Sequence, residues 1–362
     1  MKRLLQKYLL LIAEIASKII TYASKSSISI FACIFSFCIV FGGIYITSSR
    51  NLAIKQIRWQ MAHLISQLNE IGIDIAYENI EFNSMFFSPL VKINKFQIYN
   101  FNNTNNWILS FDNIKAFPNI FGTSKIRFEA SSDGVFSFND YQTSMSTDRT
   151  FLDITKQEHG FKEIVFHSQN INFKDLAKIE KISFLLQALS FKKENSSITI
   201  PSFESFFEIK NVKINGLIDY PLSSNINLIY AKSSIMGRFT PEEHLLTTLE
   251  TWLKEGGFIE VPNLIVQWEP LTLVGRGSIN FNENFSPRIN FNTSSKGILR
   301  LLDDLQKNEF LESKNVFVAN ILLSNKAFKI NPEDEELTIS TPIGYSDKKI
   351  TIENLTIKDF TK

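Results

Sequence analysis

Apolar residues recur at every second position through much of the chain after residue 73, in short runs separated by polar segments. Such alternation is typical of β-strands with one apolar face and one solvated face. Runs of this kind occur at 73–77, 80–82, 91–93, 126–130, 136–138, 212–214, 264–268, 279–281, 289–291, 337–339, 350–352 and 355–357. Asp133-Gly134 and the Asn-Glu-Asn sequence at 282–284 are predicted turns between neighbouring strands. The pattern predicts a long antiparallel meander.

Other segments have apolar residues at helical spacing. A helix at 240–256 is predicted from Thr240 as N-cap, Pro241 at the first helical position and Glu243 completing a capping box. Helices are also predicted at 296–312 and 315–325, and the ambiguous pattern at 173–191 is interpreted as a further helix. Residues 52–71 have apolar positions three and four apart, which predicts a stalk helix ending at Gly72.

The N-terminal region differs from the rest because residues 28–46 are almost wholly apolar and no charge occurs between Lys25 and Arg50. Nineteen helical residues extend about 28 Å, close to the hydrocarbon thickness of a bilayer. No small-residue cleavage site follows the run, so an uncleaved signal anchor at 26–48 is predicted. The basic residues before it favour a cytoplasmic N-terminus.

The chain is thereby divided into four parts. Residues 1–25 form a cytoplasmic amphipathic segment, 26–48 the transmembrane anchor, 49–72 the stalk helix and 73–362 an exported, β-rich domain. The predicted location is a bacterial inner membrane, crossed once, with most of the chain in the periplasm. Both cysteines, Cys33 and Cys38, lie in the predicted span, so the exported part has no disulfide available.

Charge is unevenly distributed along the 362 residues. The first 50 residues hold six basic residues and one acidic residue, whereas the net charge of the whole chain is +1. The remaining residues are therefore net acidic, which argues against a nucleic-acid-binding body.

No pattern of catalytic or metal-binding residues stands out. The four histidines have no metal-ligand spacing, and no nucleophile-elbow, zinc-protease or phosphate-loop sequence occurs. Gly275-Arg276-Gly277 lacks the third glycine of a dinucleotide loop and is read as a bend between strands. The sequence thus predicts a non-enzymatic protein without cofactor, catalytic residues or metal site.

Phenylalanine is abundant, with 33 residues. One explanation is a genome rich in A and T; the other is a sheet whose apolar face is not fully covered and accepts acyl chains. Under the second explanation the candidate groove residues lie in alternating runs. They are Phe128, Phe136, Phe138, Phe281 and Phe291. Each is equally compatible with an ordinary core.

Several segments together resemble a known bacterial family. They are 261–271, Gly275-Arg276-Gly277, 279–281, the amphipathic 299–305 segment, the strands at 337–344 and 350–360, and 80–98 with Phe87-Ser88-Pro89 before a strand. With the N-terminal anchor, this pattern resembles the family called domain of unknown function 2125, which is related to AsmA-like envelope proteins. The family has no established activity, so no catalytic residue is carried over. Asn, Lys and Ile replace many smaller residues usual in the family, which bears on the width of any groove.

The resemblance implies an α+β, mostly β fold: a transmembrane helix followed by an elongated, curled antiparallel sheet with an apolar groove and a few amphipathic helices packed on it. It implies envelope lipid handling, with membrane lipid as the partner. The expected function is to bind or pass acyl chains in that groove. The alternative is a structural or protein-interaction component of the envelope, whose sheet is packed and whose edge strands or acidic surface bind envelope protein partners.

Overall fold

The computed structural model divides the chain into two compact units, 1–61 and 62–362, and the sheet belongs to the second. The described residues are 72–85, 88–102, 105–118, 125–156, 161–189, 201–215, 222–238, 245–282, 285–308, 313–328, 337–346, 349–352 and 355–357, with helical residues between 55 and 70. None of the described helices is long and apolar enough to cross a bilayer. The predicted anchor at 26–48 lies outside the described residues.

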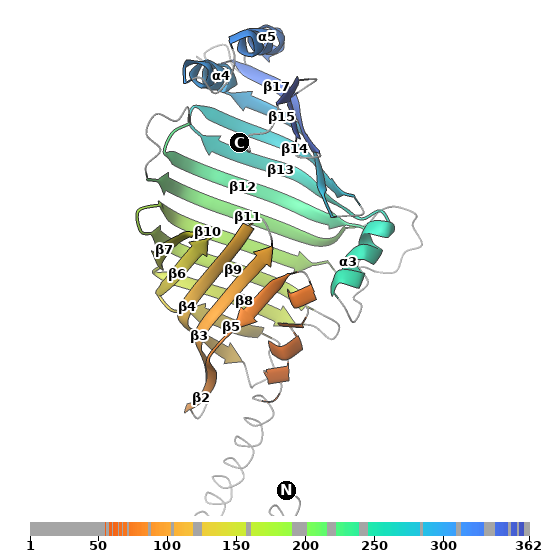
Figure 1. The fold of residues 1–362 in the computed structure, drawn as a ribbon. Helices are drawn as coiled ribbons and strands as arrows, with labels where there is room; N and C mark the ends of the chain where they lie inside the picture. The colour runs from red at the N-terminus through yellow and green to blue at the C-terminus, as the bar shows by residue number, and fades with distance from the viewer. Residues whose placement is uncertain are drawn as a thin grey trace, which may run out of the picture. The chain divides into compact units, whose positions relative to one another are not determined.

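All described strands belong to a single antiparallel sheet (Figure 1). Its strands are β1 (Ile73–Ala76), β2 (Asn79–Met85), β3 (Ser88–Asn102), β4 (Asn105–Pro118), β5 (Lys125–Ala130), β6 (Asp133–Phe138), β7 (Tyr141–Ser146), β8 (Arg149–Lys156), β9 (Phe161–Phe173), β10 (Ala177–Ala188), β11 (Pro201–Ile214), β12 (Asn225–Met236), β13 (Phe258–Trp268), β14 (Leu271–Phe281), β15 (Pro287–Lys296), β16 (Ala327–Phe328), β17 (Thr338–Ser346), β18 (Lys349–Ile352) and β19 (Leu355–Ile357). The predicted fold class, mostly β with a few helices, is confirmed.

Three pairs of short strands are halves of longer ones. β1 and β2 both pair with β3 in one continuous register. β5 and β6 both pair with β4, and β7 and β8 both pair with β9. Once these halves are joined, the sheet is a meander in which each long strand pairs with its neighbours in the chain, and only β16 departs from this order.

The predicted turn at Asp133-Gly134 is wrong. These residues lie inside the joined β5–β6 strand, where a Cβ atom on Gly134 would come within 2.5 Å of the Ser110 carbonyl oxygen. The chain reverses at Asn139-Asp140 instead, because Phe138 pairs with Tyr141. Asp-Gly here permits close approach of β4 to a bulged strand and forms no hairpin turn.

The alternation of faces is interrupted once in many of the strands. In β4 both Phe111 and Ile114 reach the same apolar cluster although they are three residues apart, and in β10 Ile179 and Ile182 do the same. Two consecutive residues between each pair are therefore left on the polar side. A strand with strict alternation would place residues three apart on opposite faces.

These interruptions are aligned across the sheet and form a line that we call the crease. It consists of the exposed residues Lys95, Asp112, Ser132, Asp148, Asn170, Glu180, Asn211 and Asn227. Lys95, Asn170 and Asn211 have positive φ values of 48°, 50° and 49°. An extra residue on the polar side lengthens that side of each strand, a change that favours a bend toward the apolar face.

Three described helices accompany the sheet: α3 (Leu245–Lys254), α4 (Ile298–Lys307) and α5 (Ser313–Ser324). α3 and α4 lie within the segments predicted for them, and α5 begins two residues before its predicted segment. The helix expected at 173–191 is wrong: most of this segment is β10, because its apolar run continues the cross-strand pairing with β9 and β11. Tertiary pairing overrides a weak local pattern here.

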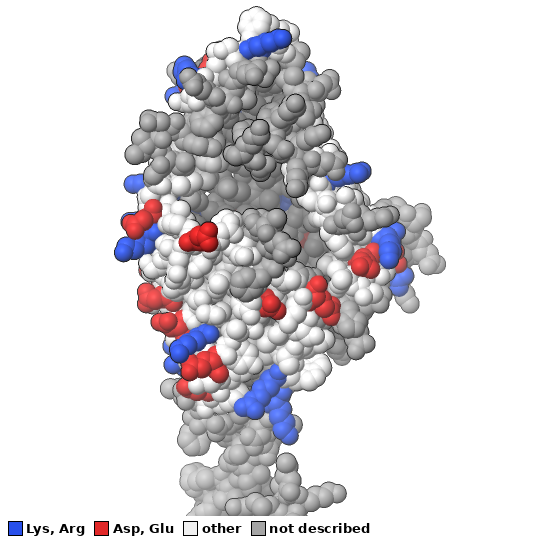
Figure 2. Space-filling model, viewed as in Figure 1, with Lys and Arg blue, Asp and Glu red and all other residues white. Residues whose placement is uncertain are grey.

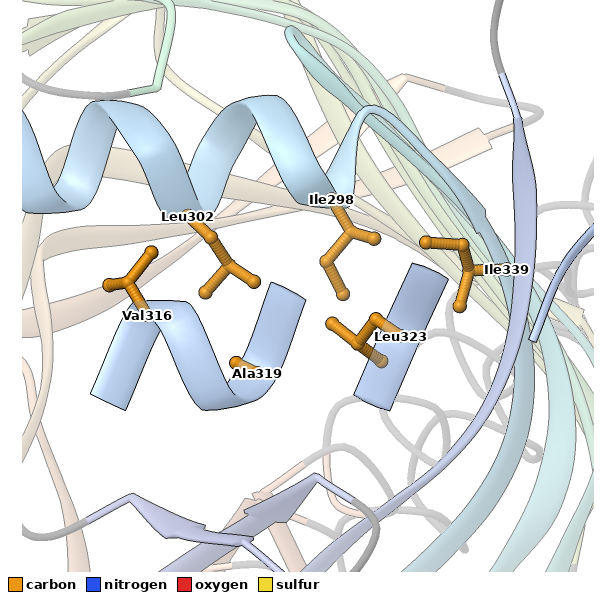
Figure 3. Close-up of a cluster of buried hydrophobic side chains, with 6 residues drawn as sticks. All are labelled: Ile298, Leu302, Val316, Ala319, Leu323 and Ile339. Carbon is orange, nitrogen blue, oxygen red and sulfur yellow. The ribbon is translucent and has the colours of Figure 1, made fainter. Parts of the chain in front are cut away.

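Helices α4 and α5 cover the apolar face near its C-terminal end. Ile298 and Leu302 of α4 pack with Val316 and Leu323 of α5 and with Ile339 of β17 (Figure 3). Gly297 precedes α4 with a φ of 78°, and a Cβ atom there would lie 1.8 Å from the Pro270 carbonyl oxygen. A glycine is therefore required where β15 turns into the covering helix.

Candidate functional site

The apolar face carries a straight row of side chains that crosses nine neighbouring long strands. Residues opposite one another in an antiparallel sheet share a face, so the register identifies the row. Its members are Val91, Ala116, Phe128, Leu152, Phe166, Phe184, Phe207, Ala231 and Leu264. We call this the central row.

Burial changes along the central row. Val91 and Ala116, at its N-terminal end, are each only 1% exposed. From Phe128 to Leu264 every member is half-buried, and so are the neighbouring Ile182, Ile209 and Ile229. The middle of the apolar face, over β8 to β12, therefore retains solvent access to large apolar side chains.

The five phenylalanines predicted to line a groove share this face but do not form one site. Phe128 belongs to the central row. Phe136 and Phe138 lie beyond the crease, where Phe136 packs edge-on against Phe173 at 5.7 Å between ring centroids. Phe281 lies 6.3 Å from the Trp252 ring of α3.

The fifth of them, Phe291 in β15, sits opposite Gly277 on one side and Ile343 on the other. Three residues of the row, Phe166, Phe184 and Phe207, were not among the predicted site residues. Phe184 lies in the segment interpreted as a helix. Phe207 follows Phe206, and two adjacent phenylalanines do not reveal which one faces the apolar side; the register places Phe206 on the polar face.

The opposite, polar face is hollowed over β8 to β12. The hollow has a volume of about 420 Å³. One cross-strand row runs through it, made of Phe151, His167, Ser183, Glu208 and Tyr230. Ser183 is the small residue at the centre, and larger side chains stand on either side of it.

Charged pairs flank the hollow. Glu208 accepts a hydrogen bond from Lys181 Nζ at 2.6 Å and forms an ion pair with Lys210 at 3.1 Å. The pKa of the Glu208 carboxyl is lowered, chiefly by the hydrogen bond from Lys181, although burial acts in the opposite direction. Glu208 is therefore a structural anion at neutral pH.

A second charged group lies on the neighbouring strands β5 and β8. Arg127 donates two hydrogen bonds to Asp153, at 2.6 and 2.7 Å, and Lys125 lies 2.9 Å from the same carboxylate. The Asp153 pKa is lowered mainly by the Arg127 hydrogen bond. The guanidinium groups of Arg127 and Arg149 lie 4.6 and 5.0 Å from the centre of the Phe151 ring. Both guanidinium groups therefore make cation–π contacts with the Phe151 ring.

His167, Ser183 and Glu208 are adjacent, but their contacts do not resemble a nucleophile with its base. The Ser183 hydroxyl donates to Glu208 at 3.4 Å, and no hydrogen bond between described residues joins it to His167. The His167 pKa is lowered by burial and then by Lys181 and Arg149. Activation of a serine requires a base within hydrogen-bond reach of its hydroxyl. Among the described residues, no group of three or more potential metal ligands converges.

Comparison with known proteins adds no identity: no protein-family model matches the chain, and no curated protein shows significant sequence similarity to it.

Proposed function

We propose that this protein is a non-enzymatic, membrane-anchored envelope protein that binds or passes lipid acyl chains along the apolar face of its sheet. One observation carries the proposal: the central row stays half-buried from Phe128 to Leu264, whereas Val91 and Ala116 at one end of the face are 1% exposed and α4 and α5 cover the other end. Exposed contiguous apolar surface normally marks a binding site.

The dimensions of the row suit an extended apolar chain. From β8 to β12 the row crosses four strand spacings of about 4.8 Å, or roughly 19 Å in all. Each methylene removed from water contributes about 0.8 kcal/mol, so a chain of about 14 carbons gains roughly 10 kcal/mol before ordering costs. Phe166, Phe184 and Phe207 would supply the floor of such a site.

The rest of the proposal rests on the sequence. An apolar N-terminal segment at 26–48 serves as the signal anchor, with residues after it in the periplasm. The resemblance to AsmA-like envelope proteins supports lipid as the ligand. The curl of the sheet toward its apolar face, which the crease favours, is compatible with a groove.

A second function, as an interaction component of the envelope, is favoured by the hollow over β8 to β12. Its aromatic floor and the exposed guanidinium of Arg149 form a surface suited to a protein partner. This function does not require lipid on the apolar face, so the two proposals are separable by experiment.

The deciding experiment uses adjacent residues of β11 that point to opposite faces. The full-length protein, Phe207→Asp and Phe206→Asp are each extracted gently, and co-purifying small molecules are identified by mass spectrometry. We expect lipid with the parent and with Phe206→Asp, whose Asp faces Lys232, and little or none with Phe207→Asp. Both variants replace a half-buried phenylalanine of the same strand with the same residue.

Two results would contradict the acyl-chain proposal. One is a folded parent protein with no lipid; the other is equal lipid in both variants. In either case the hollow over β8 to β12 becomes the better candidate for the functional site. Phe207→Leu serves as a further control, because it keeps the apolar surface and should keep the lipid.

A further inference from the structure

Helix α5 has apolar residues on both its inner and its outer sides. Val316, Ala319 and Leu323 face the core shared with α4. On the outer side Phe317 is 66% exposed, Ile321 48% and Val318 40%. Phe317 and Ile321 are four residues apart and therefore neighbours on one helical face.

The neighbouring helix α4 does not share the exposed apolar outer side of α5. It packs on the same core through Ile298 and Leu302, but its outer side carries Arg300, Asp303 and Lys307, all exposed. A surface helix of a soluble protein normally has such a polar outer face. Helix α5 therefore presents an apolar surface that α4 does not.

The composition of α5 restricts what can cover it. It has no acidic residue, and its one charged residue, Lys314, is exposed one turn before Phe317. The outer apolar side chains carry no hydrogen-bonding group, and the Tyr, Trp and Arg residues that anchor protein interfaces are absent from this helix. Among the described residues at the α4–α5 end, the exposed charged side chains are mostly basic (Figure 2): they are Arg300, Lys307, Lys314 and Lys326, against Asp303. Apolar side chains beside lysine match an anionic lipid surface.

We propose that α5 docks on the surface of an anionic lipid bilayer, with Phe317, Val318 and Ile321 among the acyl chains and Lys314 at the headgroups. Two further exposed apolar residues, Phe328 and Leu337, lie in the segments that follow the helix. The contact is separate from the acyl-chain row: it needs no lipid on the central strands, and it would hold for a protein whose function is partner binding.

The test measures how deeply one position enters a bilayer. In the full-length protein, Cys33 and Cys38 are replaced by serine, and Ile321→Cys is labelled with the fluorophore NBD. Val274→Cys, labelled in the same way, is the matched control, because Val274 is 46% exposed and lies on the polar side of β14. Both proteins are reconstituted in phosphatidylethanolamine–phosphatidylglycerol vesicles that contain nitroxide-labelled lipid.

We expect nitroxide quenching at position 321 to exceed that at 274 by at least about threefold. The added substitution Phe317→Asp should reduce it to the level of 274, and vesicles of phosphatidylcholine alone should weaken it. Quenching at 321 no stronger than at 274 would overturn the proposal. Shielding of the 321 label from aqueous iodide without nitroxide quenching would also overturn it, since a second copy of the chain would then cover the helix.

The outcome is independent of the acyl-chain proposal. Phe207→Asp, which should empty the central row, should leave quenching at position 321 unchanged. Loss of lipid with retained quenching, or retained lipid without quenching, would therefore separate the two functions.

Discussion

The C-terminal end of the apolar face and its middle are built from the same alternating pattern but have different environments. At the end, Ile339 of β17 is 1% exposed because α4 and α5 form a second layer over it. In the middle, Phe184 and Phe207 remain half-buried. The difference teaches that apolar alternation defines which face could be buried, whereas a second layer decides whether it is.

The two regions are also stabilised in different ways. The covered end gains from side-chain packing between helices and sheet. The middle has long strands hydrogen-bonded on both sides and charged pairs on its polar face, such as Lys181 with Glu208. Its stability should therefore depend less on any one apolar side chain.

The largest effect is expected when the same kind of truncation is made in each region and the losses of stability are compared. Leu302→Ala, in the core beneath α4, should lower the free energy of unfolding by about 3 kcal/mol, because it leaves a cavity between packed helices. Phe184→Ala should lower the free energy of unfolding by about 1 kcal/mol, since part of the ring is already solvated. Denaturant unfolding of the full-length protein measures both. Equal costs would mean that the middle is covered as tightly as the end.

A smaller effect is expected at the crease, which borders the open middle. Asn211 has a φ of 49°, a conformation that a β-branched residue adopts only with strain. Asn211→Val should lower the free energy of unfolding by about 1–2 kcal/mol, whereas Asn211→Gly should be close to neutral. If thermal unfolding shows that valine is tolerated as well as glycine, the bend of the middle strands does not depend on this backbone conformation.

The smallest effect concerns pH and the polar side of the open middle. The His167 pKa is lowered from 6.5, so the unfolded chain binds a proton more readily than the folded protein. Stability is unaffected well above pH 6.5 and falls as the pH drops below it. Between pH 7.5 and 5.5 the free energy of unfolding should fall less in His167→Gln than in the parent. The difference should be below about 1 kcal/mol, because the imidazole is partly solvated. Identical pH profiles for the variant and the parent would contradict this assignment.

Part of the sheet could be predicted from local pattern, but no alternating run was predicted in β4, β7, β8, β9, β10 or β12. The strands around Ile126, Ile279 and Ile289 and the three described helices occur where alternation, helical spacing and turn residues indicated them. The prediction for the β10 segment was wrong because Phe184, Leu185 and Leu186 are consecutive apolar residues, and such a run is compatible with helix or strand. Its pairing with β9 and β11 decided the matter.

The crease has a signature that is visible in the sequence but weak. Two polar residues stand between apolar ones in Ile93-Asn94-Lys95-Phe96 and in Ile179-Glu180-Lys181-Ile182. Within one strand this resembles an ordinary irregularity. Only the register shows that the interruptions face one another across the sheet.

The sequence by itself indicated part of the strands and, within each regular run, which side chains share a face, because side-chain direction alternates along a strand. It also placed Phe128, Phe136, Phe138, Phe281 and Phe291 on apolar positions. The tertiary structure alone decided which apolar positions are covered and which form a row, since register and the placement of α4 and α5 join residues far apart in the chain. Phe166, Phe184 and Phe207 come together in that way, through pairing between strands that no local pattern encodes.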